Sequence, residues 1–482
     1  MSDVRPVFYI LGVFLSALAV TMMIPALVDL AADNRDWQVF MAAAALTLFV
    51  GVALIVAFRG DLTEIDLRQG FLLTATTWLV LSAFGALPFM FSEQELSFTD
   101  AYFETVSGLT TTGATVIVGL DSLPPGILLW RALLQFVGGA GIIVMAIAVF
   151  PFLRIGGMQL FWTESSEKSD KVLPRLSSVA GATVVVYVAM TVACALLFLV
   201  VGLSPFDAIT HAMTTTSTGG FANYDNSFGQ LGNPEAEWIA TIFMFLGGCP
   251  LVLLILLARG QVRPFLTSSQ VQVFLGLIVV VSVGLGLWLF ATQDIPLGRA
   301  LRLTFFNVTS VVSTTGFAST DYNAWGGLAW VLLLMLMFVG GCTGSTSGSV
   351  KVFRLEILVR RVVSQLRAQV QPHGVFPIRY MNQLVQDDVP VGVMAFFAAY
   401  MLSFALLTVI IAACGYDFVT AITAVAAALG NVGPGLGDIV GPVGNYQPLS
   451  DLATWVLSFA MLLGRLEIFT LLMLFAPRLW RG

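Results

Sequence analysis

Long apolar runs separated by short polar stretches dominate this chain. Each run is long enough to cross a bilayer as a helix, which takes about 20 mostly apolar residues. Membrane β-barrels show a different pattern, with segments of about ten residues that alternate in polarity. We therefore predict an all-α polytopic membrane protein. The ten runs lie at 7–30, 38–58, 69–92, 127–153, 178–202, 236–258, 270–292, 327–350, 391–414 and 452–477.

The first two runs predict a hairpin, and the other eight fall into four pairs. Between the members of each pair lies a short, partly polar segment that is too short to span and ends in a glycine loop. Such segments predict half-membrane helices, and an aspartate near the start of three of them favours a helix N-terminus. The four segments run over 97–109, 205–215, 296–312 and 416–429, and the three aspartates are Asp100, Asp207 and Asp417.

The glycines of the four loops recur at nearly regular intervals, which indicates internal duplication. They are Gly113, Gly219, Gly316 and Gly433. The predicted fold class is an all-α polytopic membrane protein. It has four pseudo-symmetric helix–pore-loop–helix repeats around one ion pore, plus an N-terminal two-helix hairpin. The predicted boundaries are 1–62 for the hairpin and 63–160, 161–262, 263–380 and 381–482 for the repeats, the third with a broken inner helix.

Non-helical backbone at membrane depth must be buried in protein or line a water-filled cavity. Four glycine loops in one chain therefore predict four quarters of a filter whose backbone carbonyls replace the hydration shell of an ion. The alternative for any single loop is that small residues merely let helices pack closely. The predicted ion-binding residues of the filter are Thr111, Thr112, Gly113, Thr218, Gly219, Thr315, Gly316, Asn431, Val432 and Gly433.

The second helix of each pair carries a further pattern. Three contain a Gly-Gly pair, beginning at Gly138, Gly247 and Gly340, which predicts close helix packing or a hinge. The fourth has Gly464 followed by Arg465 at the matching place. An arginine inside a membrane-length apolar run is costly and predicts a functional role, here at the pore wall below the filter. The alternative is a buried structural ion pair with another segment.

The third of these helices is predicted to break. Glycines and hydroxyl residues replace the apolar pattern, and they make a poor helix interior. We predict a mobile gating loop under the filter; the alternative is an ordinary cytoplasmic loop after a short helix. The predicted gate consists of Gly340, Gly341, Cys342, Thr343, Gly344, Ser345, Thr346, Ser347 and Gly348, together with Arg465.

Composition agrees with the membrane prediction: 58% of the 482 residues are hydrophobic and 10% are charged, against about 25% charged in soluble domains. Basic residues cluster on the side opposite the glycine loops, so the positive-inside rule makes that side cytoplasmic. Arg131, Arg299 and Arg302 are exceptions. The residues that set the bias are Arg154, Lys168, Lys171, Arg175, Arg259, Arg263, Lys351, Arg354, Arg360, Arg361, Arg367, Arg379, Arg478 and Arg481.

Acidic residues follow the glycines on the opposite side. They predict either an acidic vestibule that concentrates cations or simply a solvated rim, and the two are compatible. They are Asp121, Asp225, Glu235, Glu237, Asp321 and Asp438.

Enzymatic chemistry has no motif in this chain. His211 and His373 are the only histidines, and neither sits in a metal or nucleophile motif. The four cysteines lack metal-ligand spacing, and no phosphate-binding loop or nucleic-acid-binding patch occurs. We predict a protein that is not an enzyme and holds no cofactor of its own.

The fourfold repeat, the single glycine of each loop, the broken third inner helix and Arg465 together resemble the Trk/Ktr/HKT potassium transporter superfamily. The resemblance covers nearly the whole chain, and the hairpin at 7–58 is similar to the bacterial TrkH/TrkG branch. It implies potassium as the ion at the filter, a pore in the bacterial inner membrane, and a homodimer. It also implies a cytoplasmic TrkA-like ring of RCK subunits that binds a nucleotide and controls opening.

The sequence leaves two alternatives, one for ion selectivity and one for the mode of transport. The fourth loop has Asn431 and Val432 before its glycine, where the other loops have threonine-rich approaches. This asymmetry puts strict selectivity for potassium over sodium in question. An ion-coupled secondary transporter, moving potassium with protons or sodium, is the alternative function, and such transporters also coordinate ions at broken helices.

Overall fold

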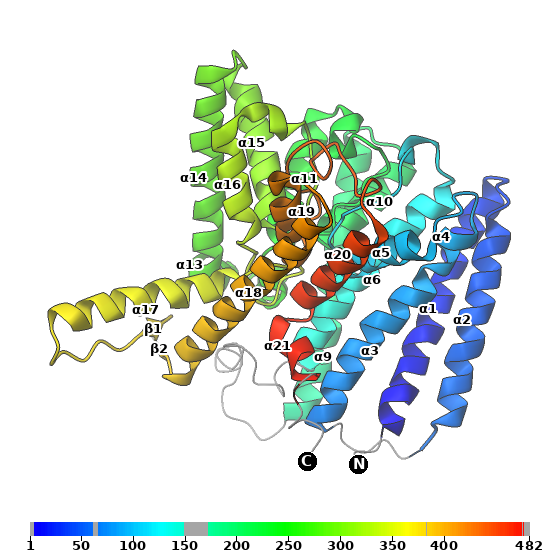
Figure 1. Cartoon of the computed structure of the whole chain (residues 1–482), viewed down its shortest axis with the longest axis horizontal. Coiled ribbons are helices and arrows are strands. Elements are labelled where there is room, and N and C mark those ends of the chain that lie inside the picture. Colours follow the sequence, from blue (N-terminus) through cyan, green and yellow to red (C-terminus); the bar gives the residue numbers. More distant parts are fainter. Residues whose placement is uncertain (1–3, 61–65, 149–171, 382, 475, 477–482) are drawn as a thin grey trace.

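The computed structural model describes residues 4–60, 66–148, 172–381, 383–474 and 476, and nearly all regular structure in them is helical. Six helical segments are long and apolar enough to cross a membrane, and two bent pairs bring the count to eight. The predicted all-α membrane fold is therefore confirmed (Figure 1). The predicted boundaries at 62/63 and 160/161 lie outside the described residues, as do the basic residues Arg154, Lys168, Lys171, Arg478 and Arg481.

The N-terminal hairpin consists of α1 (Arg5–Ala31) and α2 (Trp37–Ala57). Two glycines let these helices approach closely, because a Cβ atom on Gly12 would lie only 2.6 Å from the carbonyl oxygen of Gly51. The hairpin lies at one edge of the molecule (Figure 1). At its loop end, the carboxylate of Asp29 accepts a 2.7 Å hydrogen bond from the backbone N–H of Gly126, which ties the hairpin to the first repeat.

Four short helices precede the glycine loops, close to the predicted segments. They are α5 (Phe98–Leu109), α10 (Pro205–Thr216), α15 (Leu297–Val312) and α19 (Phe418–Gly430). Ser97 and Ser204 cap the first two and also donate to Asp100 and Asp207 in the first turn. Asp417 caps α19 itself, and hydrogen bonds from Thr420 hold the pKa of Asp417 below its usual range.

The helices that follow the loops differ more from the prediction. They are α6 (Pro125–Ala148), α11 and α12 (Pro234–Gly247, Leu251–Ala258), α16 (Gly327–Met337), and α20 and α21 (Asp451–Arg465, Ile468–Leu474). The predicted break in the third is confirmed, since α16 ends at Met337.

The predicted continuous spans 236–258 and 452–477 are wrong. Each is a pair of helices, bent by 109° and 111° respectively. In the first, α11 ends at Gly247 and a new helix begins after Pro250, which has no backbone N–H to continue the ladder. In the second, Glu467 adopts a left-handed conformation with φ of 59°, which no right-handed helix can pass through.

The remaining described helices include the one that begins each repeat. They are α3 (Leu67–Gly85), α4 (Leu87–Phe91), α9 (Val172–Val200), α13 (Val262–Thr267), α14 (Ser269–Thr292), α17 (Val352–Val370) and α18 (Asp388–Ala413). Helix α17 projects sideways from the bundle (Figure 1) and leads to the two-residue strands β1 (Arg379–Tyr380) and β2 (Gln383–Leu384), which pair antiparallel. Short 3-10 turns occur at Leu120–Ser122, Ser227–Leu231 and Tyr322–Trp325.

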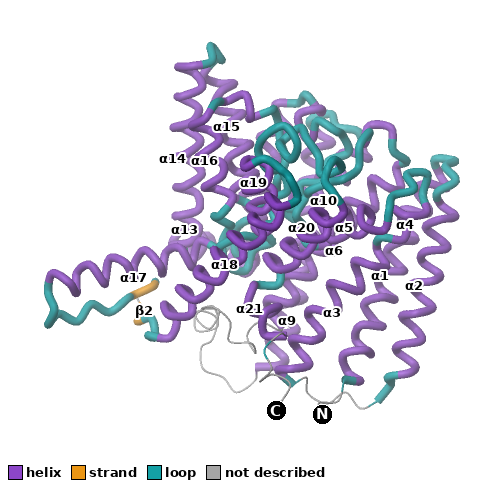
Figure 2. Tube along the Cα trace, in the orientation of Figure 1, coloured by secondary structure: helices purple, strands orange, loops and turns teal. Residues whose placement is uncertain are grey.

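Two large apolar clusters form the core. One joins the hairpin, the first repeat and the fourth repeat, and its fully buried members include Met22, Phe103 and Leu457. The other joins the second and third repeats around Phe228, Phe306 and neighbouring aromatic side chains. The loops after the four short helices gather in the upper part of the molecule as drawn in Figure 2. We call the face on which these loops lie the loop face.

Candidate ion pathway

The four glycine loops share one backbone conformation. In each, a residue in the left-handed region lies one or two positions after the last helical residue, the next residue donates its N–H to the carbonyl five positions earlier, and a glycine with positive φ follows. The left-handed residues are Thr111, Thr218, Thr314 and Asn431, with φ between 52° and 59°. The donors are Thr112, Gly219, Thr315 and Val432. The glycines are Gly113, Gly220, Gly316 and Gly433, with φ of 84°, 78°, 82° and 103°.

This equivalence corrects the register of the second loop. The sequence pattern predicts Gly219 as the filter glycine of this loop, but the residue that matches Gly113, Gly316 and Gly433 in the structure is Gly220. Gly219 instead matches Thr112, Thr315 and Val432, and its φ is not positive. A Gly-Gly pair hides this shift in the sequence, because only the backbone angles show which of the two glycines needs a positive φ.

The four loops touch one another in a closed cycle. A Cβ atom on the glycine of one loop would overlap the carbonyl oxygen that precedes the glycine of the next loop. The overlapping pairs are Gly113 with Gly219, Gly220 with Thr315, Gly316 with Val432, and Gly433 with Thr112. We call the carbonyl oxygens of Thr112, Gly219, Thr315 and Val432 the carbonyl ring. A side chain at any of the four glycines is excluded, because the neighbouring backbone occupies its place.

A cavity of about 50 Å³ opens on the loop face directly above this ring. Its lining includes Gly113, Gly220, Gly316 and Pro434, so all four loops reach it. Of the six acidic residues predicted near the mouth, Asp225 lines the cavity. The carboxylate of Asp225 also accepts hydrogen bonds of 3.0–3.1 Å from the N–H groups of Gly119 and Leu120.

Other acidic residues of that set have local structural partners. Glu237 is buried and pairs with Arg302 at 3.3 Å, and Asp321 accepts a 3.0 Å hydrogen bond from the N–H of Asn323. Glu237 therefore belongs to neither the vestibule nor a solvated rim, and both interpretations of the remaining acidic residues stay predictions.

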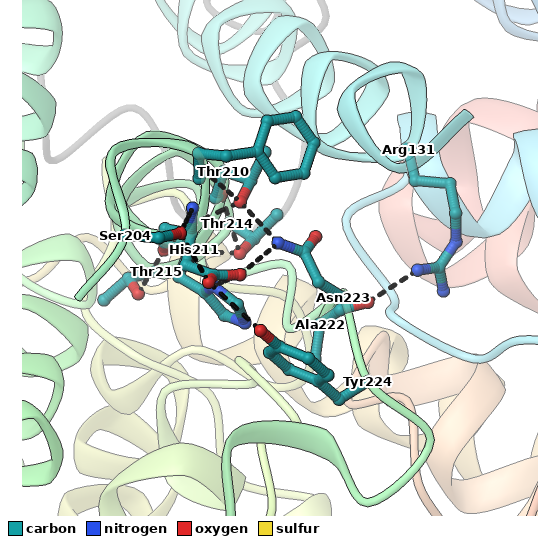
Figure 3. A network of polar contacts seen from close by, with 11 residues as sticks. Arg131, Ser204, Thr210, His211, Thr214, Thr215, Ala222, Asn223 and Tyr224 are labelled. Carbon is teal, nitrogen blue, oxygen red and sulfur yellow. Dashed lines mark hydrogen bonds and ion pairs between the residues drawn. The ribbon is translucent and has the colours of Figure 1, made fainter. Parts of the chain in front are cut away.

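Helix α6 holds the second loop through two side chains that are absent from the predicted site residues. Arg131 is buried, pairs with Glu104 at 2.8 Å, stacks over the Phe221 ring, and donates to the carbonyl of Ala222 at 2.7 Å (Figure 3). One turn later, the Nε2 atom of Gln135 donates to the Gly219 carbonyl at 2.6 Å. Arg131 and Gln135 are four positions apart, so they lie on one face of the helix, and this spacing is the sequence signal that could have identified them as a pair.

A second polar network supports the same loop from the side of α10. The carboxylate of Asp207 accepts hydrogen bonds from Ser204, from Asn223 at 2.8 Å and from the Tyr224 hydroxyl at 3.0 Å (Figure 3). His211 is buried beside it, with Nδ1 2.9 Å from the Asp207 carbonyl oxygen. Asp207 thus holds Asn223 and Tyr224, which follow Gly219 and Gly220, and the His211 ring stacks beside the Tyr224 ring.

The stretch predicted as a gate lies against the opposite side of the ring. Its two ends are pinned together, because Val339 and Val350 form a β-bridge and the N–H of Gly340 donates to the Val350 carbonyl at 2.8 Å. The loop itself is buried: Cys342 and Thr346 are 0% exposed. This burial disfavours the alternative of an ordinary loop outside the membrane.

The loop contacts the left-handed residues of three repeats. The hydroxyl of Thr346 lies 3.0 Å from that of Thr218, and the N–H of Gly348 donates to the Thr314 hydroxyl at 2.7 Å. A Cβ atom on Gly348 would lie 2.9 Å from the Cβ of Asn431. Further predicted gate residues contact the second repeat: the N–H of Cys342 donates to Gly248, and the carbonyl of Gly344 accepts from Leu251. The remaining members, Gly341, Thr343, Ser345 and Ser347, lie within the same buried stretch or at its edge.

Arg465 reaches the same loop from the fourth repeat. Its side chain is 3% exposed, and Nη1 donates to the carbonyl of Thr346 at 2.8 Å. Its Nε and Nη2 atoms have no hydrogen-bond partner among the described residues. The alternative of a buried ion pair finds no support there, since the nearby Glu467 pairs with Arg354 instead.

The small residues of the inner helices are explained by close packing. A Cβ atom on Gly138 or Gly464 would overlap a carbonyl in the last turn of the preceding short helix, at Leu109 or Leu429, and one on Gly247 would lie 3.0 Å from the carbonyl of Thr216. The cysteines act as packing residues as well: Cys194, Cys249 and Cys342 are buried, and Cys414 is half-buried. No cluster of three or more metal-ligating side chains occurs in the described residues.

Comparison with known proteins shows similarity along the whole chain. Residues 36–481 match the profile of the TrkH family, described as a cation transport protein. The Trk system potassium uptake protein TrkI of Halomonas elongata is 44% identical over 480 residues, which cover 99% of this chain and 97% of the relative. TrkH of Escherichia coli K12 is 39% identical, with 99% of each chain covered. The crystal structure of the potassium transporter TrkH from Vibrio parahaemolyticus has a TM-score of 0.91 at 37% identity, with 99% of each chain covered.

Proposed function

Because the chain belongs to the TrkH family of cation transport proteins, we propose that it takes up potassium across the bacterial inner membrane through a channel-like pore. The family relatives are named as potassium uptake proteins, and the chain has several helices able to span a membrane. The loop face is then the outer face, since the basic residues lie on the other side. No catalytic step in this chain is needed for such transport.

The observation that carries the proposal is the closed cycle of four loops. Four carbonyl oxygens from four repeats lie against four glycines at one level of the molecule. Carbonyl rings of this kind can replace the hydration shell of an alkali cation. The C-terminal ends of the four short helices point toward the same level, and the partial negative charge there favours a cation. We accordingly propose that the carbonyl oxygens of Thr112, Gly219, Thr315 and Val432 bind the ion, and that the residues on either side of them hold the loops in place.

Below the ring, we propose that the stretch Gly340–Gly348 is the gate and that Arg465 raises the barrier to cations. The buried loop contacts Thr218 and Thr314, so it cannot move without breaking contacts with the filter loops. The unpaired guanidinium nitrogens of Arg465 place a positive charge beside the loop. A cation leaving the filter would have to pass both.

The driving force does not require nucleotide hydrolysis in this chain. A membrane potential of 100 mV contributes about 2.3 kcal/mol for each monovalent cation that enters. We propose that a nucleotide-binding TrkA-like ring on the cytoplasmic side regulates opening, and that the chain works as a homodimer. The Trk system names of its relatives support association with further subunits.

Ion flux from proteoliposomes that contain this chain alone tests the proposal. We expect Rb⁺ and K⁺ to pass faster than Na⁺ without any gradient of a second ion. Flux that depends on a proton or sodium gradient would instead favour the ion-coupled transporter.

In the same vesicles, Gly316→Ser should change the K⁺/Na⁺ permeability ratio, because the new side chain would overlap the Val432 carbonyl. An unchanged ratio would remove the support for the filter.

A further inference from the structure

The four members of the carbonyl ring are not equivalent, because a side chain engages one of them. The Nε2 atom of Gln135 donates to the Gly219 carbonyl at 2.6 Å, and its Oε1 atom accepts from the N–H of Phe221 at 3.0 Å. One side-chain amide thus pairs with the backbone on both sides of Gly220. In the described part of the chain, no side chain donates to the matching carbonyls of Thr112, Thr315 or Val432.

The position of Gln135 is fixed by its surroundings. It is 0% exposed and lies on α6, one turn from Arg131, which holds the carbonyl of Ala222 in the same loop. The side chain also fills the space beside Gly219, since a Cβ atom there would lie 2.9 Å from Nε2. An amide in so fixed a place has little freedom to release the carbonyl.

We propose that Gln135 is a specificity-determining residue that weakens one oxygen of the carbonyl ring and so favours potassium over sodium. The proposal rests on the filter proposed above. An N–H group beside a carbonyl oxygen opposes the attraction of that oxygen for a cation. The balance between ions depends on the number and field strength of the coordinating carbonyl dipoles. Sodium, whose dehydration costs more, needs a stronger field than potassium does.

The contrast with the fourth loop supports a specific role for the second. There, the Tyr446 hydroxyl donates to the carbonyl of Gly433 itself, at 2.7 Å, one residue beyond the carbonyl ring. That contact anchors the loop and leaves the Val432 oxygen without a side-chain donor among the described residues. Anchoring a loop therefore does not require engaging a ring carbonyl, and Gln135 does more than anchor.

The test is the K⁺/Na⁺ permeability ratio, obtained from reversal potentials in bilayers that contain the full chain. Gln135→Met keeps the length of the side chain but removes both amide partners. We expect the ratio to fall about fivefold, which corresponds to about 1 kcal/mol. A ratio that stays the same or rises while current persists would overturn the proposal. A purely structural role would lower protein yield and total current without moving the ratio.

A second test variant and a control variant complete the experiment. Gln135→Asn keeps an amide but shortens the side chain, so that it cannot reach both partners; it should move the ratio in the same direction even if Gln135→Met fails to fold. The matched control is Gln293→Leu, which removes an amide donor to the Ala324 carbonyl at 2.8 Å, away from the ring, and should leave the ratio unaltered. If Gly316→Ser changes the ratio and both Gln135 variants do not, this inference fails while the filter stands. If none changes it, the filter fails as well.

Discussion

At the scale of single residues, the backbone of the second glycine loop depends on which of two adjacent glycines carries the positive φ. Gly220 has φ of 78°, and a Cβ atom there would overlap the backbone carbonyl of Thr315. The three atoms nearest to a Cβ atom on Gly219 all belong to the side-chain amide of Gln135, and none of them is backbone. The two positions therefore differ in the kind of obstacle that a side chain meets.

We predict that Gly220→Ala lowers Rb⁺ uptake at least about tenfold relative to Gly219→Ala. The left-handed conformation alone costs a non-glycine residue roughly 1–2 kcal/mol, and about 1.4 kcal/mol is a factor of ten. Uptake into cells that lack other potassium systems measures the effect, normalised to the amount of protein in the membrane. Equal uptake by the two variants, or the reverse order, would contradict the assigned register.

At the scale of elements, breaks in the inner helices create the space for the candidate gate. Helix α11 ends at Gly247, α16 ends at Met337, and α20 ends at Arg465. The buried stretch after α16 contacts the ends of the other two, through Gly247 and Arg465. Helix α6 of the first repeat is not interrupted within its described range, Pro125–Ala148. In the second, third and fourth repeats, the inner helices are thus interrupted close to the buried stretch below the carbonyl ring.

Removing either part of this barrier should increase conduction. We predict that Arg465→Ala, or deletion within residues 341–348, raises unitary conductance or Rb⁺ flux. Loss of one positive charge near the path is expected to lower the barrier by about 1.4 kcal/mol, or roughly tenfold in rate. Arg367→Ala, an exposed arginine at the end of α17, is the matched control and should have no effect. If flux is unaltered in both test variants, the gate and the charge barrier are wrong.

At the scale of the whole molecule, hydrogen bonds between neighbouring repeats form a closed belt on the loop face, in addition to the carbonyl ring. Asp225 binds Gly119 across the first two repeats, and the N–H of Gly229 donates to the Ala318 carbonyl across the next two. Asn323 and Gly437 join the third repeat to the fourth. The N–H of Tyr446 donates to the Thr115 carbonyl and returns the belt to the first repeat. The belt surrounds the cavity above the ring.

The charge that this belt presents should attract cations. We predict that Asp225→Asn lowers unitary conductance about twofold at an ionic strength near 0.1 M and has no effect near 1 M. The reason is that screening lengths are about 10 Å and 3 Å at these concentrations. Asp438→Asn removes an exposed charge that does not line the cavity and serves as the control. A reduction of the same size at both ionic strengths would point to a structural effect instead.

The sequence by itself determined the class of protein, the four short helices and the four glycine loops. Periodic apolar length and local cap residues are properties of neighbouring positions, so they can be seen in one dimension. It also determined the break after Met337, since glycine and hydroxyl residues weaken a helix wherever it lies. The helices found at 98–109, 205–216, 297–312 and 418–430 follow the predicted segments within a few residues.

Only the tertiary structure decided which atoms of different repeats meet. The choice of Gly220 over Gly219 depends on backbone angles and on the Thr315 carbonyl. The bend at Glu467 involves a partner far along the chain, because its carboxylate pairs with Arg354. The amide of Gln135 reaches the Gly219 carbonyl 84 positions away. Contacts between residues distant in sequence arise from packing of the whole fold, and no local pattern of apolar and polar positions encodes them.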